Sequence, residues 1–420
     1  MKSKLIALLS ALLAILFIFN LVGCTKRVSA QNLLDGVTAQ AVEGLEADEE
    51  FVLSQIQFSV NLFKGSVNQE KNQNTLISPL SIMIALALAA NGANGETLAQ
   101  MESVLGMSID KLNEYLYSFA SALPNNEYGS VSLANSVWMK EDEYLEVEKD
   151  YLQTVANYYD ADIFSAPFDD KTLKDVNNWV NNKTDGLIKN ALDRINEDAI
   201  LYLINTLLFE ADWPSVYERS DVLNGTFTAK NGEEQSAKMM RSTEWKYIEP
   251  ENATGFVKNY KNRGYSFVGI LPNEGVDINE YIASLNASDL LVQLEKPYGY
   301  ETKVRLPKFE YDFSVNLNDV LKNMGMTNAF DWQLADFSKM ATYNLPNYNV
   351  YIGNVLHQTS ITVAEKGTRA GAVTVIEMEK DGSAAPSEII KYVYLDRPFV
   401  YMIIDSQTKL PIFIGHVENL

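Results

Sequence analysis

Cysteine and histidine are nearly absent from this chain of 420 residues, which contains one cysteine, Cys24, and two histidines, His357 and His416. One thiol cannot form an intramolecular disulfide, and it cannot supply the ligands of a cysteine-rich metal site. Neither the G-x-S-x-G nor the H-E-x-x-H motif occurs, and there is no glycine-rich loop that would hold a phosphate. A lone histidine in a strand-like segment is usually a buried core residue. The sequence therefore gives no indication of an enzyme, a metal site or a cofactor.

Positive charge is also scarce, because 34 lysines and arginines stand against 55 aspartates and glutamates and leave a net charge of −21. Binding to nucleic acid requires a basic surface, so this composition argues against it. Pro/Ser-rich linkers and repeats are absent too, while 47% of the residues are hydrophobic. The chain can therefore bury a large core, and one large domain or several smaller ones would both fit its length.

The first residues have the composition of a targeting segment. Lys2 and Lys4 precede an apolar stretch, Leu5 to Phe19, which is followed by Leu21-Val22-Gly23-Cys24. This last motif resembles the lipobox of bacterial lipoproteins, in which the cysteine is lipidated and becomes the new N-terminus. An ordinary signal peptide or an uncleaved anchor is the alternative, although the apolar stretch is short for a membrane-spanning helix.

We therefore expect residues 1–23 to be a lipoprotein signal peptide and residues 24–48, which are mostly polar, to be a lipidated tether. Secretion, and a lipid anchor at the outer face of a bacterial membrane, follow from this interpretation. Lipidation of Cys24 would leave the mature protein without a free thiol, which excludes thiol catalysis.

Helical and strand-like patterns are unevenly distributed along the rest of the chain. Residues 51–63 repeat apolar side chains at helical spacing, and residues 82–90 are apolar nearly all round, which is typical of a buried central helix. Helical patterns continue to about residue 123 and recur at 144–158 and 171–183. Strand-like segments dominate the second half, at 200–209, 265–271, 303–313, 359–365, 390–395, 398–404 and 411–417. Helices first and strands later predict an α+β fold rather than a doubly wound parallel sheet.

The segment from Glu365 to Gly382 contains little that does chemistry, yet small or apolar residues recur in it at every second position. In an extended strand such positions face one side. At the leading end these residues are all small: Thr368, Ala370, Ala372 and Thr374. The segment is thus composed like a half-buried strand, although it begins and ends with loop-like residues.

A series of short motifs, from about Phe51 to the last residue, resembles the serpin family. The motifs are Asn74 through Ser81 with Asn91-Gly92-Ala93 and Thr97, Leu203-Ile204-Asn205 leading to Trp213, Lys238-Met239-Met240, Leu306-Pro307-Lys308-Phe309, Met324-Gly325-Met326, Ala335-Asp336-Phe337-Ser338, Asp396-Arg397-Pro398-Phe399 and Pro411-Ile412-Phe413-Ile414-Gly415. This resemblance implies one serpin domain, residues 49–420, with three β-sheets, about nine helices and an exposed reactive loop at about 365–390.

The same resemblance implies a function. In inhibitory serpins an endopeptidase cleaves the reactive loop, is held as an acyl-enzyme, and is carried across the molecule when the cut loop inserts into the central sheet. About 15 inserted residues at ~3.3 Å each would span about 50 Å. The chain would then be a metastable, monomeric suicide inhibitor of a serine or cysteine endopeptidase. A non-inhibitory serpin that acts as a binding or chaperone-like module is the alternative, but such members usually carry bulky, charged or proline residues at the inward hinge positions.

Individual roles are also implied by the resemblance. The hinge of the reactive loop would comprise Glu365, Gly367, Thr368, Ala370, Ala372 and Thr374. The polar cluster beneath the point where the sheet opens, called the shutter, would comprise Ser78, Ser81, Asn205 and His357. Trp213 matches the tryptophan at the top of that opening, called the breach. Arg369 departs from the family pattern, because it stands where an acidic residue is common, but it would face outward.

The position of the reactive bond stays open. Counting from Glu365 by family spacing places the reactive bond after Asp381, and a count shorter by one residue places it after Lys380. Because the segment before Asp396 is longer than usual, counting back from it gives positions 383–385 instead. The candidates are Lys380, Asp381, Gly382, Ser383 and Ala384. Lys380 would suit a trypsin-like or lysine-directed cysteine protease, or is merely a solvated charge, whereas Asp381 would suit only an acid-directed protease.

Overall fold

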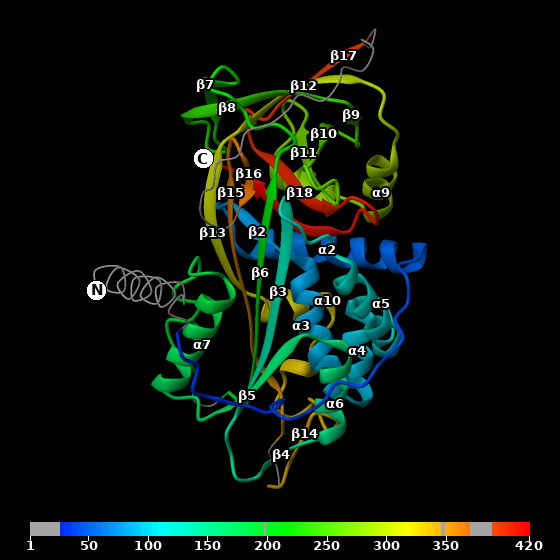
Figure 1. Ribbon diagram of the computed structural model, residues 1–420, viewed down its shortest axis with the longest axis vertical. Coiled ribbons are helices and arrows are strands. Elements are labelled where there is room, and N and C mark those ends of the chain that lie inside the picture. Colours follow the sequence, from blue (N-terminus) through cyan, green and yellow to red (C-terminus); the bar gives the residue numbers. More distant parts are fainter. Residues whose placement is uncertain (1–25, 197–198, 346–348, 370–388) are drawn as a thin grey trace, which may run out of the picture.

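The computed structural model describes residues 26–196, 199–345, 349–369 and 389–420. Several predicted features lie outside these residues. They are the signal segment with Cys24, the hinge positions Ala370, Ala372 and Thr374, and the candidates for the reactive bond, Lys380, Asp381, Gly382, Ser383 and Ala384. Figure 1 shows how the helices and sheets of the described residues are arranged.

Nine α-helices occur in the described residues, which confirms the helix content implied by the resemblance. They are α2 (Glu49–Gln69), α3 (Pro79–Gly92), α4 (Gly95–Leu105), α5 (Ile109–Ala122), α6 (Lys149–Tyr158), α7 (Asp170–Lys183), α8 (Ile278–Ser284), α9 (Ala287–Glu295) and α10 (Asn318–Met324), with a short 3₁₀-helix, η1 (Asn328–Phe330). Ser78 caps α3, and Pro79 follows at the first position, where a missing N–H costs little. Helix α3 is buried along almost its whole length, against β3, β6 and β19.

Three larger β-sheets and one small one are formed by the described strands. The first, which we call the large sheet, has the order β1 (Gln31–Asn32), β5 (Ala161–Ala166), β3 (Gly129–Lys140), β6 (Leu201–Asp212), β16 (Gly367–Arg369), β15 (Ile352–Val363) and β13 (Phe309–Asn316). The second has the order β2 (Thr75–Ile77), β19 (Pro411–Val417), β18 (Phe399–Asp405), β11 (Tyr265–Pro272), β10 (Ala253–Asn259) and β9 (Lys246–Ile248).

The third sheet lies at the upper end of the molecule in Figure 1, and we call it the upper sheet. Its order is β17 (Ile390–Tyr394), β12 (Glu301–Pro307), β8 (Glu234–Glu244) and β7 (Val222–Thr228). A small two-stranded sheet joins β14 (Ala341–Tyr343) to β4 (Leu145–Val147). Mixed helices and sheets in this arrangement confirm the predicted α+β class.

The middle of the large sheet changes its pairing along its length. Over the lower part, β6 and β15 are parallel neighbours as far as Gln358, which lies opposite Thr206. Further up, β16 lies between them and is antiparallel to both, with Thr368 opposite Ala211 of β6. We expected an exposed loop from Glu365 onward, but the three residues of β16 belong to the sheet. Strand β16 belongs to the large sheet because its backbone pairs with β6 on one side and with β15 on the other.

The N-terminal segment lies along the fold. Strand β1 pairs antiparallel with β5 at the edge of the large sheet, with Asn32 opposite Phe164. The Asn32 amide donates a hydrogen bond to Asp162 Oδ1 at 2.8 Å, and the Ser29 hydroxyl donates to Asp175 Oδ2 at 2.7 Å. Part of the segment predicted as a polar tether therefore pairs with an otherwise open sheet edge, through the two residues of β1.

Two predictions of secondary structure were wrong in detail. The helix expected at 144–158 is divided, because residues 145–147 form β4 and α6 begins only at Lys149. The first half of the chain also contains β3 and β5, which we did not predict. Strand β3 alternates only in part, because Asn135 interrupts its apolar side and Trp138 lies on the opposite side. Its extended form is stabilised by pairing with β5 and β6, which no local pattern reports.

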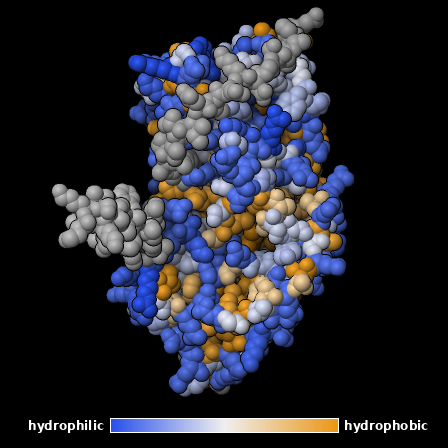
Figure 2. Space-filling view, in the orientation of Figure 1, coloured by the Kyte–Doolittle hydropathy of each residue, from blue (hydrophilic) through white to orange (hydrophobic). Residues whose placement is uncertain are grey.

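The core fills the space between the sheets and α3. Most buried apolar side chains form one cluster, and a second, smaller one surrounds Trp138 and Trp179 beneath α7. On the face shown in Figure 2, apolar residues gather in the middle of the molecule, whereas the upper end is mostly hydrophilic.

Candidate functional site

Four side chains that the sequence resemblance grouped as the shutter lie together where α3, β6 and β15 meet. The Ser78 N–H donates to His357 Nε2 at 3.0 Å, and His357 Nδ1 lies 2.6 Å from Asn205 Oδ1. The Ser81 hydroxyl donates to the same Asn205 oxygen at 3.2 Å. None of the four residues is more than 2% exposed. We call these residues the lower cluster.

The bonds of His357 define its protonation. Because the Ser78 N–H donates to Nε2, that nitrogen carries no proton, and the proton on Nδ1 is donated to Asn205. Burial lowers the pKa of His357 to about 3, so the ring is neutral at physiological pH. The imidazole is therefore a structural link between β15, β6 and the start of α3. Loss of a partner would leave a buried polar group unpaired, which costs roughly 1–3 kcal/mol.

A second group of side chains surrounds β16, and we call it the upper cluster. Trp213, the predicted breach residue, follows β6 and stacks on Tyr260 with ring centroids 4.5 Å apart and planes inclined by 5°. Trp213 Nε1 donates to the Ala364 carbonyl at 2.9 Å. The Tyr260 hydroxyl donates to Thr368 Oγ1 at 2.6 Å, and Thr368 is 1% exposed. Tyr260 is thus a partner of the hinge that we did not identify from the sequence, because no motif marks it.

Two ion pairs flank the upper cluster. Lys258 and Glu244 lie 2.8 Å apart and are largely buried, and the Lys258 ammonium is 5.3 Å from the centroid of the Trp213 ring. Burial alone would lower the pKa of Lys258, but its interactions with neighbouring groups, Glu244 first, raise it above the ordinary value. Lys308 and Glu365 lie 2.8 Å apart. Burial would raise the pKa of Glu365, but the bond to Lys308 outweighs this and lowers it.

Gly367 has a steric role at the start of β16. A Cβ atom at this position would lie 2.1 Å from the carbonyl oxygen of Ala211. The sequence resemblance assigned this glycine to the hinge of the reactive loop, where glycine would leave the backbone free to move. The structure gives a different reason, since only a residue without a side chain allows β16 to approach β6 so closely.

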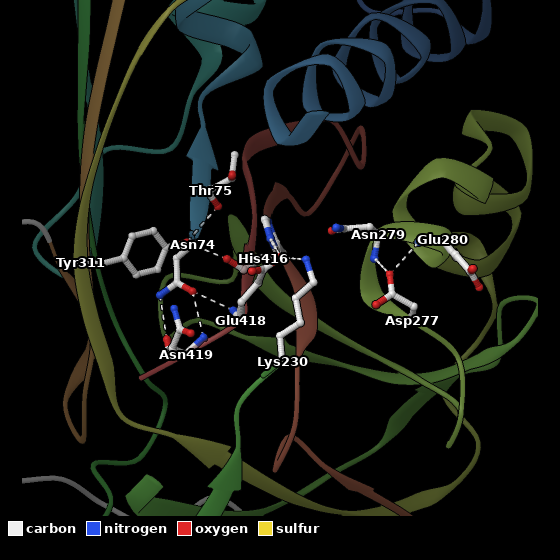
Figure 3. A network of polar contacts seen from close by, with 10 residues as sticks. All are labelled: Asn74, Thr75, Lys230, Asp277, Asn279, Glu280, Tyr311, His416, Glu418 and Asn419. Atoms are coloured by element: carbon white, nitrogen blue, oxygen red, sulfur yellow. Dashed lines mark hydrogen bonds and ion pairs between the residues drawn. The ribbon is translucent and has the colours of Figure 1, made fainter. Parts of the chain in front are cut away.

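A third polar network ties down the end of the chain (Figure 3). Asn74 Oδ1 accepts the N–H groups of Glu418 at 2.7 Å and Asn419 at 3.1 Å. The Glu418 carboxylate contacts Lys230 at 2.5 Å and His416 Nε2 at 3.2 Å. His416 is fully buried, as we expected of a core histidine, but its Nδ1 has no hydrogen-bond partner. The network secures strand β19 and is separate from the opening of the large sheet.

The structure brings together all of the predicted shutter residues, and it places Trp213 beside the described part of the hinge. No group of three or more His, Cys, Asp or Glu side chains in the described ranges is arranged to hold a metal ion. In the same part of the chain, no helix is both long and apolar enough to cross a membrane.

Comparisons with known proteins identify one family. Residues 53–420 match the family model for the serpins, described as serine protease inhibitors. An uncharacterised serpin-like protein of Thermococcus kodakarensis is 30% identical, over 89% of this chain and 87% of its own length. A serine protease inhibitor of Cyanea capillata is 29% identical, over 86% of this chain and 97% of its own length.

Among solved structures, the thermophilic serpin tengpin in its native state is 45% identical, covers 94% of this chain and 100% of its own, and superposes with a TM-score of 0.87. In its latent state the same protein gives 42% identity, coverage of 90% and 99%, and a TM-score of 0.76.

Proposed function

This chain belongs to the serpin family, and we propose that it is a secreted suicide inhibitor that traps a serine or cysteine endopeptidase. Serpins are generally protease inhibitors rather than enzymes. In the proposed reaction the nucleophile of the endopeptidase attacks the carbonyl carbon of the reactive bond, the amine of the following residue leaves, and an ester or thioester joins the loop to the enzyme. The cut loop of the inhibitor then inserts as a strand and moves the enzyme before water can hydrolyse the ester or thioester.

The observation that carries this proposal is the position of β16. Strand β16 already lies between β6 and β15 and pairs with both. Below it, the two strands pair directly, with His357 opposite Asn205. Insertion of further residues therefore has to separate β6 from β15 at the lower cluster.

The register of β16 predicts where the following residues would arrive. Arg369 lies opposite Glu210 of β6, and β15 pairs with β16 in an antiparallel register as well. When both registers are continued for five residues, Thr374 arrives opposite Asn205 on one side and His357 on the other. A small residue of the predicted hinge would thus replace the direct contact that holds the sheet closed.

The length of β6 agrees with the position of the candidate reactive bonds. Strand β6 has 12 residues, and Gly367 lies opposite its upper end, Asp212. An inserted strand that pairs along all of β6 would end at Met378 and would span about 40 Å at ~3.3 Å per residue. This is shorter than the 50 Å expected from the family pattern. The first candidate, Lys380, follows two residues later, so an attached endopeptidase would be carried to the far end of the sheet.

The principal test compares Thr368→Arg with the wild-type protein on a panel of endopeptidases, using denaturing gels and mass spectrometry of the released peptide. We expect the wild type to form a complex that resists denaturant. The variant should be cleaved without forming a complex, because Thr368 is 1% exposed in β16 and a buried charge there would displace the strand from which insertion has to proceed. Ser215→Arg, at an exposed site close to the same end of β6, is the matched control and should inhibit normally.

A thermal melt distinguishes inhibition from the alternative function. Cleavage of the loop between positions 380 and 385 by a non-target protease should raise the melting temperature steeply, because the cut loop completes the large sheet. An ordinary loop that is cut leaves the melting temperature unchanged or lowers it, because the unfolded chain gains entropy. A cut protein that melts no higher than the intact one would support a non-inhibitory serpin that acts as a binding module.

We also propose that the mature protein is anchored to a bacterial membrane by a lipid on Cys24. The proposal rests on the motif Leu21-Val22-Gly23-Cys24 after a short apolar stretch. Cys24→Ser should move the protein from the detergent phase to the aqueous phase, since the thioether cannot form without the thiol. Retention of the variant in the detergent phase would instead indicate an uncleaved helical anchor.

A further inference from the structure

One face of the upper sheet has an unusual composition. Strands β12 and β17 are parallel and in register, so Lys303 lies beside Tyr392 and Arg305 beside Tyr394. On the next strand Arg241 lies opposite Arg305. The alternate positions of β12 and β17 include buried valines, which places these five side chains on the outward side. We call this surface the Tyr–Arg face.

The side chains of the Tyr–Arg face are held in place by one another. The Arg305 guanidinium carbon lies 4.1 Å from the centroid of the Tyr394 ring. The rings of Tyr392 and Tyr394 meet edge to face, with centroids 5.9 Å apart, while Tyr392 remains 59% exposed. The Arg241 side chain donates to the Ser220 carbonyl at 2.7 Å. Ordered tyrosine and arginine side chains lose little entropy on binding, and both residue types dominate the energetics of protein interfaces.

The charge of this face contrasts with that of the whole chain. It carries three cations, Arg241, Lys303 and Arg305, and the adjacent acidic residue on the same strand, Glu301, is paired with Lys303 at 2.6 Å. The chain as a whole has a net charge of −21. A partner that fits here presents carboxylates together with flat apolar groups.

The position of the face identifies the partner. The candidate reactive bonds lie 5 to 10 residues before Ile390, the first residue of β17. A chain of that length extends at most about 18–36 Å, whereas a globular endopeptidase of ~230 residues is about 45 Å across. An endopeptidase engaged on the loop is therefore brought against the upper sheet, which lies at one end of the molecule (Figure 1).

We propose that the Tyr–Arg face is a docking surface for the target endopeptidase, which it contacts outside the active site while the loop is being cleaved. This inference rests on the proposed function, because it takes the loop to be a protease substrate. It adds a prediction about the target: the surface next to its substrate cleft carries acidic residues.

The test uses Tyr392→Ser combined with Arg305→Glu in the full mature chain. The matched control combines Trp332→Ser with Lys339→Glu, which change an exposed aromatic residue and an exposed lysine in the segment between η1 and β14. Strand β14 lies at the opposite end of the molecule from the upper sheet (Figure 1). The probes are trypsin, subtilisin and papain. For each, kcat/KM for cleavage of the loop is measured at low and high salt, together with the rate constant of complex formation where a complex forms. A free peptide of residues 370–389 gives the rate without the upper sheet.

For the probe that cleaves the wild type fastest, we expect the variant to react at least ten-fold more slowly at low salt and the difference to shrink at high salt. The control pair should react at the wild-type rate, and cleavage of the peptide, which lacks the upper sheet, should show the weaker salt dependence of the variant. A change of less than two-fold for every probe would overturn the proposal. A dimer of the wild type in sedimentation that the variant loses, with an unchanged cleavage rate, would assign the face to a second copy of the chain and would also overturn it.

Cleavage rates are defined even where no complex forms, so failure of inhibition and failure of docking are distinguishable. If the first variant melts at a lower temperature than the wild type, Lys303→Gln with Arg305→Gln removes the charge without reversing it. That pair should retain the wild-type melting temperature and still lose most of the salt dependence.

Discussion

His357 of β15 and Asn205 of β6 lie opposite each other on parallel strands, and a hydrogen bond of 2.6 Å joins the imidazole to the side-chain amide oxygen. Both residues are almost completely buried, 152 positions apart in the chain. The bond lies just beyond the point where β16 stops separating the two strands. In the proposed mechanism it has to break before the cut loop can insert.

Asn205→Ala should therefore weaken the closed sheet. The substitution leaves the His357 Nδ1–H and the Ser81 hydroxyl without their shared acceptor. We expect a loss of roughly 1–3 kcal/mol in the stability of the native state. Mild heating should then produce polymers, because the opened sheet can accept the loop of another molecule as a strand. Thermal melts and size exclusion after heating measure the two effects.

A neighbouring asparagine provides the control for that variant. Asn135 of β3 lies opposite Asn205 and is also buried, but its side-chain oxygen has no hydrogen-bond partner. Asn135→Ala should destabilise the native state less than Asn205→Ala does, and it should not promote polymers. Equal behaviour of the two variants would show that loss of volume, and not the bond to His357, determines the effect.

Low pH should destabilise the protein through His357. Burial lowers its pKa from 6.5 to about 3 in the folded state. Between these values the unfolded chain binds a proton that the folded chain does not, so stability falls as the pH falls, by up to about 1.4 kcal/mol per pH unit. Well above pH 7 the histidine is neutral in the folded and the unfolded state, and it contributes almost no pH dependence.

Burial also lowers the pKa of His416. A fall in the stability of the wild type at low pH therefore does not show by itself which histidine is responsible. His357→Gln should be less stable than the wild type at pH 7.5. Between pH 7.5 and pH 5.0 the free energy of unfolding of this variant should fall by about 2 kcal/mol less than that of the wild type, because glutamine at position 357 does not titrate. If calorimetry shows the same loss of stability in both proteins between these pH values, His357 is not the source of the pH dependence.

Gly367→Ala should push β16 out of the large sheet. The added Cβ would meet the Ala211 carbonyl oxygen at 2.1 Å, and backbone atoms cannot move aside cheaply. We expect faster hydrogen exchange of the Thr368 amide and faster cleavage of the loop by a non-target protease. Gly299→Ala is the control, because a Cβ at that exposed position has no neighbour within 4 Å.

Deletion of residues 25–47 should expose the edge of the large sheet. Strand β1 pairs with β5 there, and Leu33 and Leu34 pack on the core. We expect a melting temperature several degrees lower and concentration-dependent association, because β5 becomes an unpaired edge strand. Leu33→Ala with Leu34→Ala keeps the strand but removes apolar contact. This pair should lower the melting temperature without causing association in sedimentation experiments.

The sequence by itself determined those features that depend on neighbouring residues. Ser78 and Pro79 mark the start of α3, and its continuous apolar composition predicts burial, because capping and helical periodicity are local effects. The alternation of small residues from Thr368 onward is likewise local. The order of the family motifs, which resembles the serpins, was enough to predict the fold class and to group the four shutter residues.

Only the tertiary structure decided which distant residues meet. That β16 already lies in the large sheet depends on hydrogen bonds from β6 and β15, and the partnership of Thr368 with Tyr260 joins residues 108 positions apart. The strand β3, with its serines and asparagine, is extended because its neighbours pair with it. The Tyr–Arg face exists because three strands align Arg241, Arg305 and Tyr394 side by side. Register between strands is set by packing across the whole molecule, and no short stretch of sequence contains it.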